Sequence, residues 1–104
     1  MSVTVIDSLD AFKAEIAKPG LTVIDFWATW CGPCVRIAPW FKEQAGTNAD
    51  INFCKVDVDE QEEISAHVGI KCMPTFKFYK NGELLETMEG ANKDGLTNLF
   101  AKHK

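Results

Sequence analysis

Short runs of apolar residues, separated by longer segments with helical spacing, dominate the pattern of this 104-residue chain. Val3–Ile6, Thr22–Ala28 and Ile51–Val58 have the length and composition of strands. Thr22–Ala28 has almost no polar positions, which is typical of a strand buried on both faces of a parallel or mixed sheet. We therefore expect this run near the centre of a sheet.

Two helices are predicted between these strands. Ser8 precedes apolar residues at helical spacing and can cap a helix that stops at Pro19-Gly20. A second helical pattern runs from Pro33 to about Ala45. Pro39 lies inside this pattern, where a proline removes one hydrogen bond and costs about 3 kcal/mol. Because a local rule is broken there, we expect a useful kink.

The second half of the chain is expected to contain two more helices and a hairpin. Asp59 and Glu62 have the spacing of a capping box, and Gly69 is expected to end the helix that follows. Asn81-Gly82 between two strand-like runs is a strong local signal for a hairpin. Asn92 can cap the last helix. The strands of the hairpin are expected at Thr75–Tyr79 and Glu83–Glu89.

The resulting order, β-α-β-α-β-α-β-β-α, predicts an α/β fold with a mixed sheet and helices on both faces. No repeat, linker or low-complexity segment interrupts it, so residues 1–104 are expected to form one domain. A net charge of −4 argues against nucleic acid or an anionic membrane surface as the main partner. The sequence shows no secretory signal and no apolar run of membrane-spanning length, which favours the cytoplasm.

Cys31-Gly32-Pro33-Cys34 follows the central strand and begins the second helix. Backbone N–H groups at a helix N-terminus stabilise a thiolate, so we expect the pKa of Cys31 to lie below its free value. Gly32 leaves room for a substrate, and Pro33 suits the first turn. The i, i+3 spacing lets a disulfide form and open with small adjustments. Because Cys34 heads the inward stripe, Cys31 is expected to attack a partner's disulfide and Cys34 to resolve the mixed disulfide.

A zinc site or a permanent structural disulfide would also use two cysteines. Zinc usually takes two pairs of ligands, and neither Cys54 and Cys72 nor the two histidines have a matching spacing. A reducing compartment disfavours a permanent disulfide framework. Redox chemistry without a metal is therefore the favoured interpretation.

Asp25 and Lys55 each interrupt an apolar strand. A buried carboxylate is costly unless it is paired or protonated, and a perturbed pKa beside reactive groups indicates function. The alternative is an edge strand in which Asp25 is solvated. If both residues are buried, pairing Asp25 with Lys55 would offset the cost of burying each.

At these residues the chain closely resembles the thioredoxin family over essentially its whole length, and its KVDVDE and CMPTF segments look most like eukaryotic members. The resemblance implies the thioredoxin fold, a central mixed five-stranded sheet flanked by four helices with a C-terminal antiparallel hairpin. It also implies a general protein disulfide reductase that needs no bound cofactor. Such a protein acts on disulfide-containing client proteins and is recharged by an NADPH-dependent thioredoxin reductase. The resemblance is carried by Trp30-Cys31-Gly32-Pro33-Cys34 and by Asp25, Pro39, Lys55, Pro74, Gly82 and Gly90.

The resemblance assigns roles to the residues around the cysteine pair. Asp25 is expected to accept the proton of Cys34 through water, with Lys55 beside it. Pro74 is expected to be the cis-proline of the family, although most X-Pro bonds are trans. Backbone flanking Pro74 would bind an extended client segment by strand addition. The apolar groove for that segment is expected to involve Trp30, Gly32, Pro33, Met73, Pro74, Thr75, Gly90 and Ala91.

Some positions leave alternatives open. Val35 stands where the family often has lysine, which removes a positive charge near Cys31. Cys54 is expected to be a buried, inert thiol, whereas Cys72, close to Pro74, is either incidental or a regulatory thiol that links two chains. We expect a monomer. A binding subunit without turnover and a disulfide oxidant or isomerase remain alternative functions, but a Gly-Pro pair between the cysteines favours a reductant.

Overall fold

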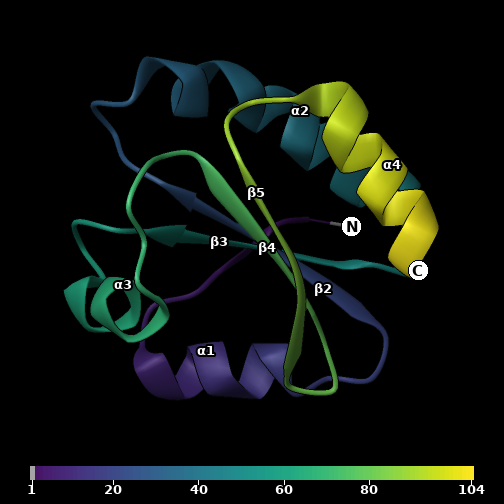
Figure 1. Cartoon of the computed structure of the whole chain (residues 1–104), viewed down its shortest axis with the longest axis horizontal. Coiled ribbons are helices and arrows are strands. Elements are labelled where there is room, and N and C mark those ends of the chain that lie inside the picture. Colours follow the sequence, from purple (N-terminus) through teal and green to yellow (C-terminus); the bar gives the residue numbers. More distant parts are fainter. Residues whose placement is uncertain (1) are drawn as a thin grey trace.

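The computed structural model describes residues 2–104, and its elements follow the expected order around a five-stranded mixed sheet (Figure 1). Met1, the first residue of the expected domain, lies outside the described residues. The strands are β1 (Thr4–Val5), β2 (Leu21–Trp27), β3 (Asn52–Asp57), β4 (Thr75–Lys80) and β5 (Glu83–Glu89). The helices are α1 (Leu9–Ile16), α2 (Gly32–Thr47), α3 (Glu62–Val68) and α4 (Lys93–His103).

The strand order across the sheet is β1-β3-β2-β4-β5, so β2 lies at the centre as expected. The pairs β1–β3 and β2–β3 are parallel, whereas β2–β4 and β4–β5 are antiparallel. All residues of β2 except Trp27 are buried, including Asp25. The alternative in which Asp25 is solvated on an edge strand is therefore wrong.

Two apolar cores lie on opposite faces of the sheet, one under α1 and α3 and the other under α2 and α4 (Figure 1). Successive residues of a strand point to opposite faces. Ile24 accordingly belongs to the first core and Val23 to the second. Asp25 therefore shares the face of Val23 and lies beneath α2.

The expected caps of α1 and α4 are present, but that of α3 is wrong. Ser8 Oγ accepts the N–H of Ala11 at 3.0 Å, and Asn92 Oδ1 accepts the N–H of Gly95 at 2.9 Å. The N-cap of α3 is Gln61, without a side-chain hydrogen bond, and not Asp59. The carboxylate of Asp59 instead accepts the Nε1–H of Trp30 at 2.8 Å. The backbone N–H of Asp59, which Glu62 would accept in a capping box, donates to Asp57 at 2.9 Å.

The hairpin between β4 and β5 turns at Asn81-Gly82, as expected. Asn81 has φ 54° and Gly82 has φ 83°. A two-residue hairpin turn of type I′ requires positive φ at both central residues, and Asn-Gly adopts these angles at low energetic cost. The hairpin aligns Thr75, at the start of β4, with Glu89, at the end of β5.

Phe53 offers a test of how the α2–α4 core stabilises the fold. Its ring on β3 lies 5.2 Å from that of Phe41 on α2 and 5.3 Å from that of Phe100 on α4, measured between centroids. We expect Phe53→Ala to lower the free energy of unfolding by about 3–5 kcal/mol, because it leaves a cavity that touches both helices. Val5→Ala, at a side chain that is 64% exposed, should change it by less than about 0.5 kcal/mol. Equal effects in urea unfolding would contradict this assignment.

Candidate active site

The cysteine pair lies where β2 leads into α2. Cys31 is the N-cap residue of α2, with extended backbone angles, and Pro33 is in the first turn. The backbone N–H of Cys34 donates to the sulfur of Cys31 at 3.3 Å. This is the arrangement expected from the sequence, since the cap position directs the sulfur at an N–H group that no helical carbonyl uses.

The two sulfurs of Cys31 and Cys34 form a disulfide, with 5.3 Å between the Cα atoms. The side chains differ in accessibility in the expected direction, since Cys31 is 6% exposed and Cys34 is 1% exposed. Both residues are buried in the disulfide form, Cys34 more completely than Cys31. This disulfide can be reduced reversibly to a dithiol, in which an approaching group would reach Cys31 before Cys34.

The start of β4 lies beside the end of β2. Thr75 pairs with Phe26, which places the Met73–Pro74 segment alongside the loop that leads to Cys31. The Met73–Pro74 peptide bond is cis, as the resemblance implied. The carbonyl of Pro74 accepts the N–H of Gly90 at 2.9 Å, which ties this segment to the end of β5. Pro74 itself thus has no free carbonyl, and within residues 2–104 the backbone N–H and C=O of Met73 form no hydrogen bond.

Two further residues of the expected groove are placed by side-chain contacts. Trp30 is 66% exposed beside Cys31, and its Nε1–H donates to Oδ2 of Asp59 at 2.8 Å. Thr75 is buried, and its hydroxyl donates to the carbonyl of Cys72 at 2.6 Å. Asp59, expected only as a helix cap, therefore orients the exposed tryptophan, a long-range contact that local sequence patterns do not reveal.

Asp25 and Lys55 lie opposite each other in the register of β2 and β3, but they do not form the expected ion pair. Asp25 is 3% exposed, and its Oδ1 has no hydrogen-bond partner within residues 2–104. The Nζ of Lys55 instead lies 5.5 Å from the centre of the Trp27 ring. A long lysine can place its ammonium over an aromatic face near water, which is less costly than burial against one carboxylate.

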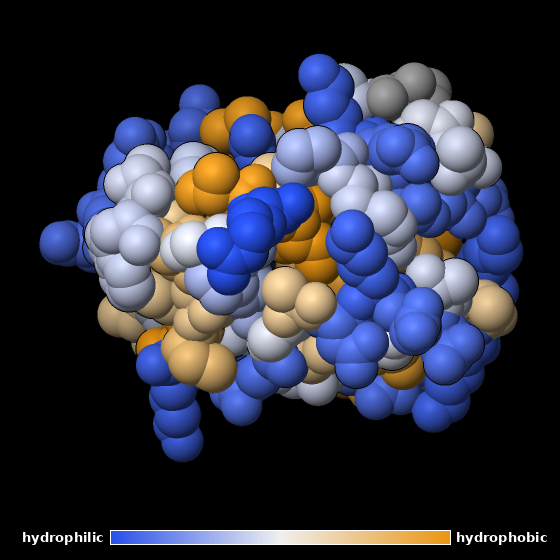
Figure 2. Space-filling view, turned by 90° about the horizontal axis from the view of Figure 1, so that it is seen from above, coloured by the Kyte–Doolittle hydropathy of each residue, from blue (hydrophilic) through white to orange (hydrophobic). Residues whose placement is uncertain are grey.

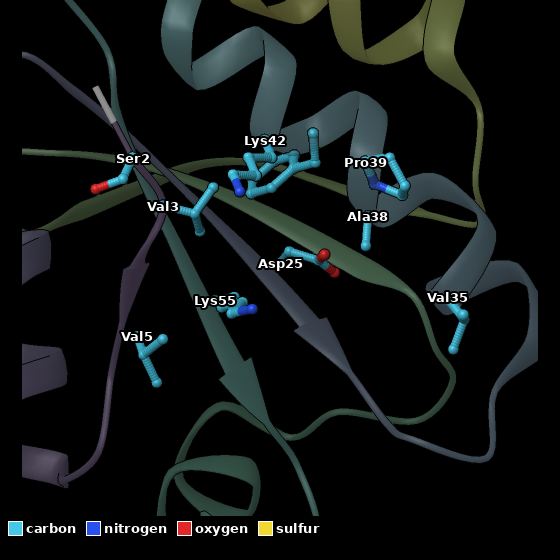
Figure 3. A pocket seen from close by; sticks show the side chains of 10 residues that line it. Ser2, Val3, Val5, Asp25, Val35, Ala38, Pro39, Lys42 and Lys55 are labelled. Carbon is cyan, nitrogen blue, oxygen red and sulfur yellow. The ribbon is translucent and has the colours of Figure 1, made fainter.

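The side chains of Asp25 and Lys55 project into one pocket of about 610 Å³, beneath Ala38 and Pro39 of α2 (Figure 3). Burial raises the pKa of Asp25 to about 7, and the positive charge of Lys55 only partly opposes this rise. The carboxyl group can therefore exchange a proton near neutral pH. The pocket is roomy enough for water, which such an exchange requires.

The other two cysteines have different surroundings. Cys54 is buried on β3, and its sulfur lies 3.6 Å from Oε1 of Glu15. Burial, followed by the charge of Glu15, raises the pKa of Cys54 to about 12, which agrees with an inert thiol. Cys72 is exposed.

Two further possibilities considered from the sequence, a metal site and a membrane-spanning helix, can be compared with the described part of the chain. Among residues 2–104, His, Cys, Asp and Glu side chains form no group of three that could hold a metal ion. None of the helices in this range is long and apolar enough to cross a membrane. Sequence reasoning did not single out Arg36, whose guanidinium lies close to Gly32.

Comparison with known proteins agrees with this geometry. A family model described as Thioredoxin matches residues 3–102. A thioredoxin of Malassezia sympodialis is 48% identical over 103 residues, which cover 97% of this chain and 98% of that protein. The crystal structure of the M. sympodialis protein superimposes with a TM-score of 0.92 at 46% identity, covering 98% of this chain and 90% of that one. The X-ray structure of Fasciola hepatica thioredoxin gives a TM-score of 0.95 at 38% identity, covering 98% and 100%. The chain therefore belongs to the thioredoxin family of thiol–disulfide oxidoreductases.

Proposed function

We propose that this protein reduces disulfides of client proteins and is recharged by an NADPH-dependent thioredoxin reductase. The observation that supports this most is the hydrogen bond from the N–H of Cys34 to the sulfur of Cys31. A donor at the helix N-terminus stabilises a thiolate more than a neutral thiol. Cys31 is also the more exposed of the two residues. Both features suit Cys31 as the nucleophile and Cys34 as the resolving group.

The exchange takes place in two steps. The Cys31 thiolate attacks one sulfur of the client disulfide, so that a Cys31–client disulfide forms and the other client sulfur leaves as a thiolate and takes up a proton. The Cys34 thiolate then attacks the sulfur of Cys31, which closes the Cys31–Cys34 disulfide and releases the second client thiol. Two electrons pass to the client. The reductase returns two electrons from NADPH to the cysteine pair.

Asp25 is proposed to take the proton that Cys34 must lose before it attacks. Cys34 and Ala38 are one turn apart on α2, and Ala38 lines the pocket into which Asp25 projects. A water molecule in this pocket would connect the thiol with the carboxylate. With a pKa of about 7, Asp25 is both ionised and protonated to a useful extent at neutral pH. Lys55 is proposed to keep part of the carboxyl group ionised through its charge.

The client segment is proposed to lie in extended form across the Met73–Pro74 segment. The backbone groups of Met73, which form no hydrogen bond within residues 2–104, can pair with it in the manner of an added strand. Trp30 on one side and Gly90 and Ala91 on the other would border this segment. Gly32 and Pro33 leave the approach to Cys31 open.

Insulin reduction with NADPH and thioredoxin reductase tests the proposed reaction. We expect turnover by the native protein and none above background for Cys31→Ser or Cys34→Ser, because each removes one step of the exchange. Cys34→Ser should accumulate a client linked to Cys31, visible by mass spectrometry. Cys54→Ala, which removes the buried thiol, should keep its activity.

Two other measurements test the alternative functions. Full cellular function of the Cys31→Ser/Cys34→Ser double variant would support a binding subunit. A weakly reducing potential of the cysteine pair, measured against glutathione, would support an oxidant or isomerase.

Asp25→Asn tests the proton-accepting role. We expect attack by Cys31 to change less than about twofold, whereas resolution by Cys34 slows about 10²-fold, because general base assistance is lost. Quenched-flow mass spectrometry at pH 7 should then show accumulation of the mixed disulfide, with Cys34→Ser as the reference for complete trapping. If the intermediate does not accumulate and turnover is unchanged, Asp25 has no such role.

The raised pKa of Asp25 also predicts a pH-dependent stability. Well below pH 3.8 the carboxyl group is protonated in both the folded and unfolded states, whereas above pH 7 the fold must contain a buried carboxylate. A folded pKa of about 7 against a usual value of 3.8 corresponds to a loss of about 4 kcal/mol as pH rises between them. We expect Asp25→Asn to be more stable than the native protein at pH 8, with a difference of up to this size that vanishes well below pH 3.8. Urea unfolding of the oxidised proteins measures it, and Asp50→Asn, at an exposed aspartate, should show no such pH-dependent gain.

A further inference from the structure

A second pocket, of about 290 Å³, lies between the start of α2 and the start of α4. It is separate from the pocket that contains Asp25, and the two share no lining residue. Pro33 and Ala91 connect it to the proposed client groove, because Pro33 lies between the two reactive cysteines and Ala91 follows Gly90. The pocket is lined by Pro33, Arg36, Ile37, Ala91 and Lys93.

Arg36 is the only arginine of the chain, and it lies against the reactive loop. A methyl group on Gly32 would lie 3.0 Å from Nη1 of Arg36, so the guanidinium covers the backbone next to Cys31. Any larger residue at position 32 would displace it. The absence of a side chain at Gly32 thus lets a planar, permanently charged group lie against the backbone that follows Cys31.

Lys93 places a second positive charge on the same pocket, and neither charge is neutralised locally. The ion pairs within residues 2–104 involve Lys18, Lys102 and His103, and none involves Arg36 or Lys93. Lys93 is the first residue of α4, where the helix dipole disfavours a cation. Asp94 is adjacent in sequence, but neighbouring residues of a helix do not face each other.

We infer that Arg36 and Lys93 bind a carboxylate of the client, an aspartate or glutamate close to its reactive cysteine, and so determine which disulfides are reduced fastest. The inference rests on the proposed function and concerns the same reaction. A guanidinium can hold both oxygens of a carboxylate, and the lysine ammonium adds a flexible second contact. The surface on the side of α2 and α4 also carries hydrophilic side chains beside hydrophobic ones, which suits a partly polar contact (Figure 2).

The net charge of the protein makes this pair distinctive. With a formal charge of −4, the molecule as a whole repels acidic segments. Two unpaired cations at a pocket that Pro33 also lines reverse that repulsion locally, close to the segment between the two reactive cysteines. The expected client is therefore not acidic throughout, but has one acidic residue at a fixed distance from its cysteine.

Reduction of matched peptides tests the inference. Peptides that contain one cysteine, with acetylated and amidated ends, are prepared as symmetric disulfide dimers. In each peptide, one of the two positions before the cysteine or of the two positions after it carries Glu, Gln or Lys. The reduced protein is mixed with each dimer, and the second-order rate constant is measured by acid quench and chromatography. At one or more positions we expect Glu peptides to react about three- to tenfold faster than Gln peptides, and less so at high salt.

Variants assign this preference to the two residues. Arg36→Gln/Lys93→Gln should abolish the Glu-over-Gln ratio, and Arg36→Glu/Lys93→Glu should invert it in favour of Lys peptides. Lys13→Gln, which removes an exposed charge on α1 across the sheet, should leave the ratio unchanged. The Glu-over-Gln ratio does not depend on changes in the reactivity of Cys31 itself, because such a change alters the rate constants of all peptides by the same factor.

The outcomes separate this inference from the proposed function. If Gln peptides are reduced normally but Glu gives no advantage at any position, the charged pair has no part in selection and the reductase function stands. If the advantage persists in the Arg36→Gln/Lys93→Gln variant, other residues bind the carboxylate and the inference is wrong. If no peptide is reduced, the proposed function fails and the inference fails with it.

Discussion

The hydrogen bond between the N–H of Cys34 and the sulfur of Cys31 is the contact on which the reactive end of the molecule depends. It exists because Cys31 is the residue that precedes the first turn of α2, while Cys34 lies within that turn. Were the helix to begin one residue later, that N–H group would no longer face the sulfur. Pro33 helps to fix the start, since its ring suits the first turn and its missing N–H is not needed there. One capping position thus determines both the reactivity of the outer sulfur and its distance from the inner one.

The same central strand that leads to Cys31 also carries Asp25, a carboxyl group that is costly to bury. Because β2 is covered on both faces, Asp25 has no solvated side, and its Oδ1 remains without a partner in the described part of the chain. The consequence is a carboxyl group whose pKa lies near 7 instead of near 4. An apolar residue would suit the core better, so packing does not account for this carboxyl group, whereas the proposed proton transfer would.

Local patterns predicted the order of elements because most signals lie within a few residues of the structure they determine. Ser8, Asn92 and Asn81-Gly82 act on their own backbone, and the structure confirms all three. The capping role expected of Asp59 failed because its carboxylate accepts the indole N–H of Trp30, a partner 29 residues away in sequence. The pairing of Asp25 with Lys55 failed for another reason. Strand register places two residues side by side, but it does not determine where a four-carbon side chain ends. The pocket beside Arg36 was missed because Ala91 and Lys93, which line it from the other side, are more than 50 residues away in sequence.

The periodicity of α2 explains how two separate pockets can lie along the helix that begins at the reactive pair. Residues three and four apart share a helix face, whereas adjacent residues are turned by about 100°. Val35, Ala38, Pro39 and Lys42 therefore line the pocket of Asp25, while Pro33, Arg36 and Ile37 line the pocket that Lys93 also borders. One helix thus keeps the proposed proton acceptor and the proposed carboxylate-binding residues on different faces, although both lie near the same cysteine pair.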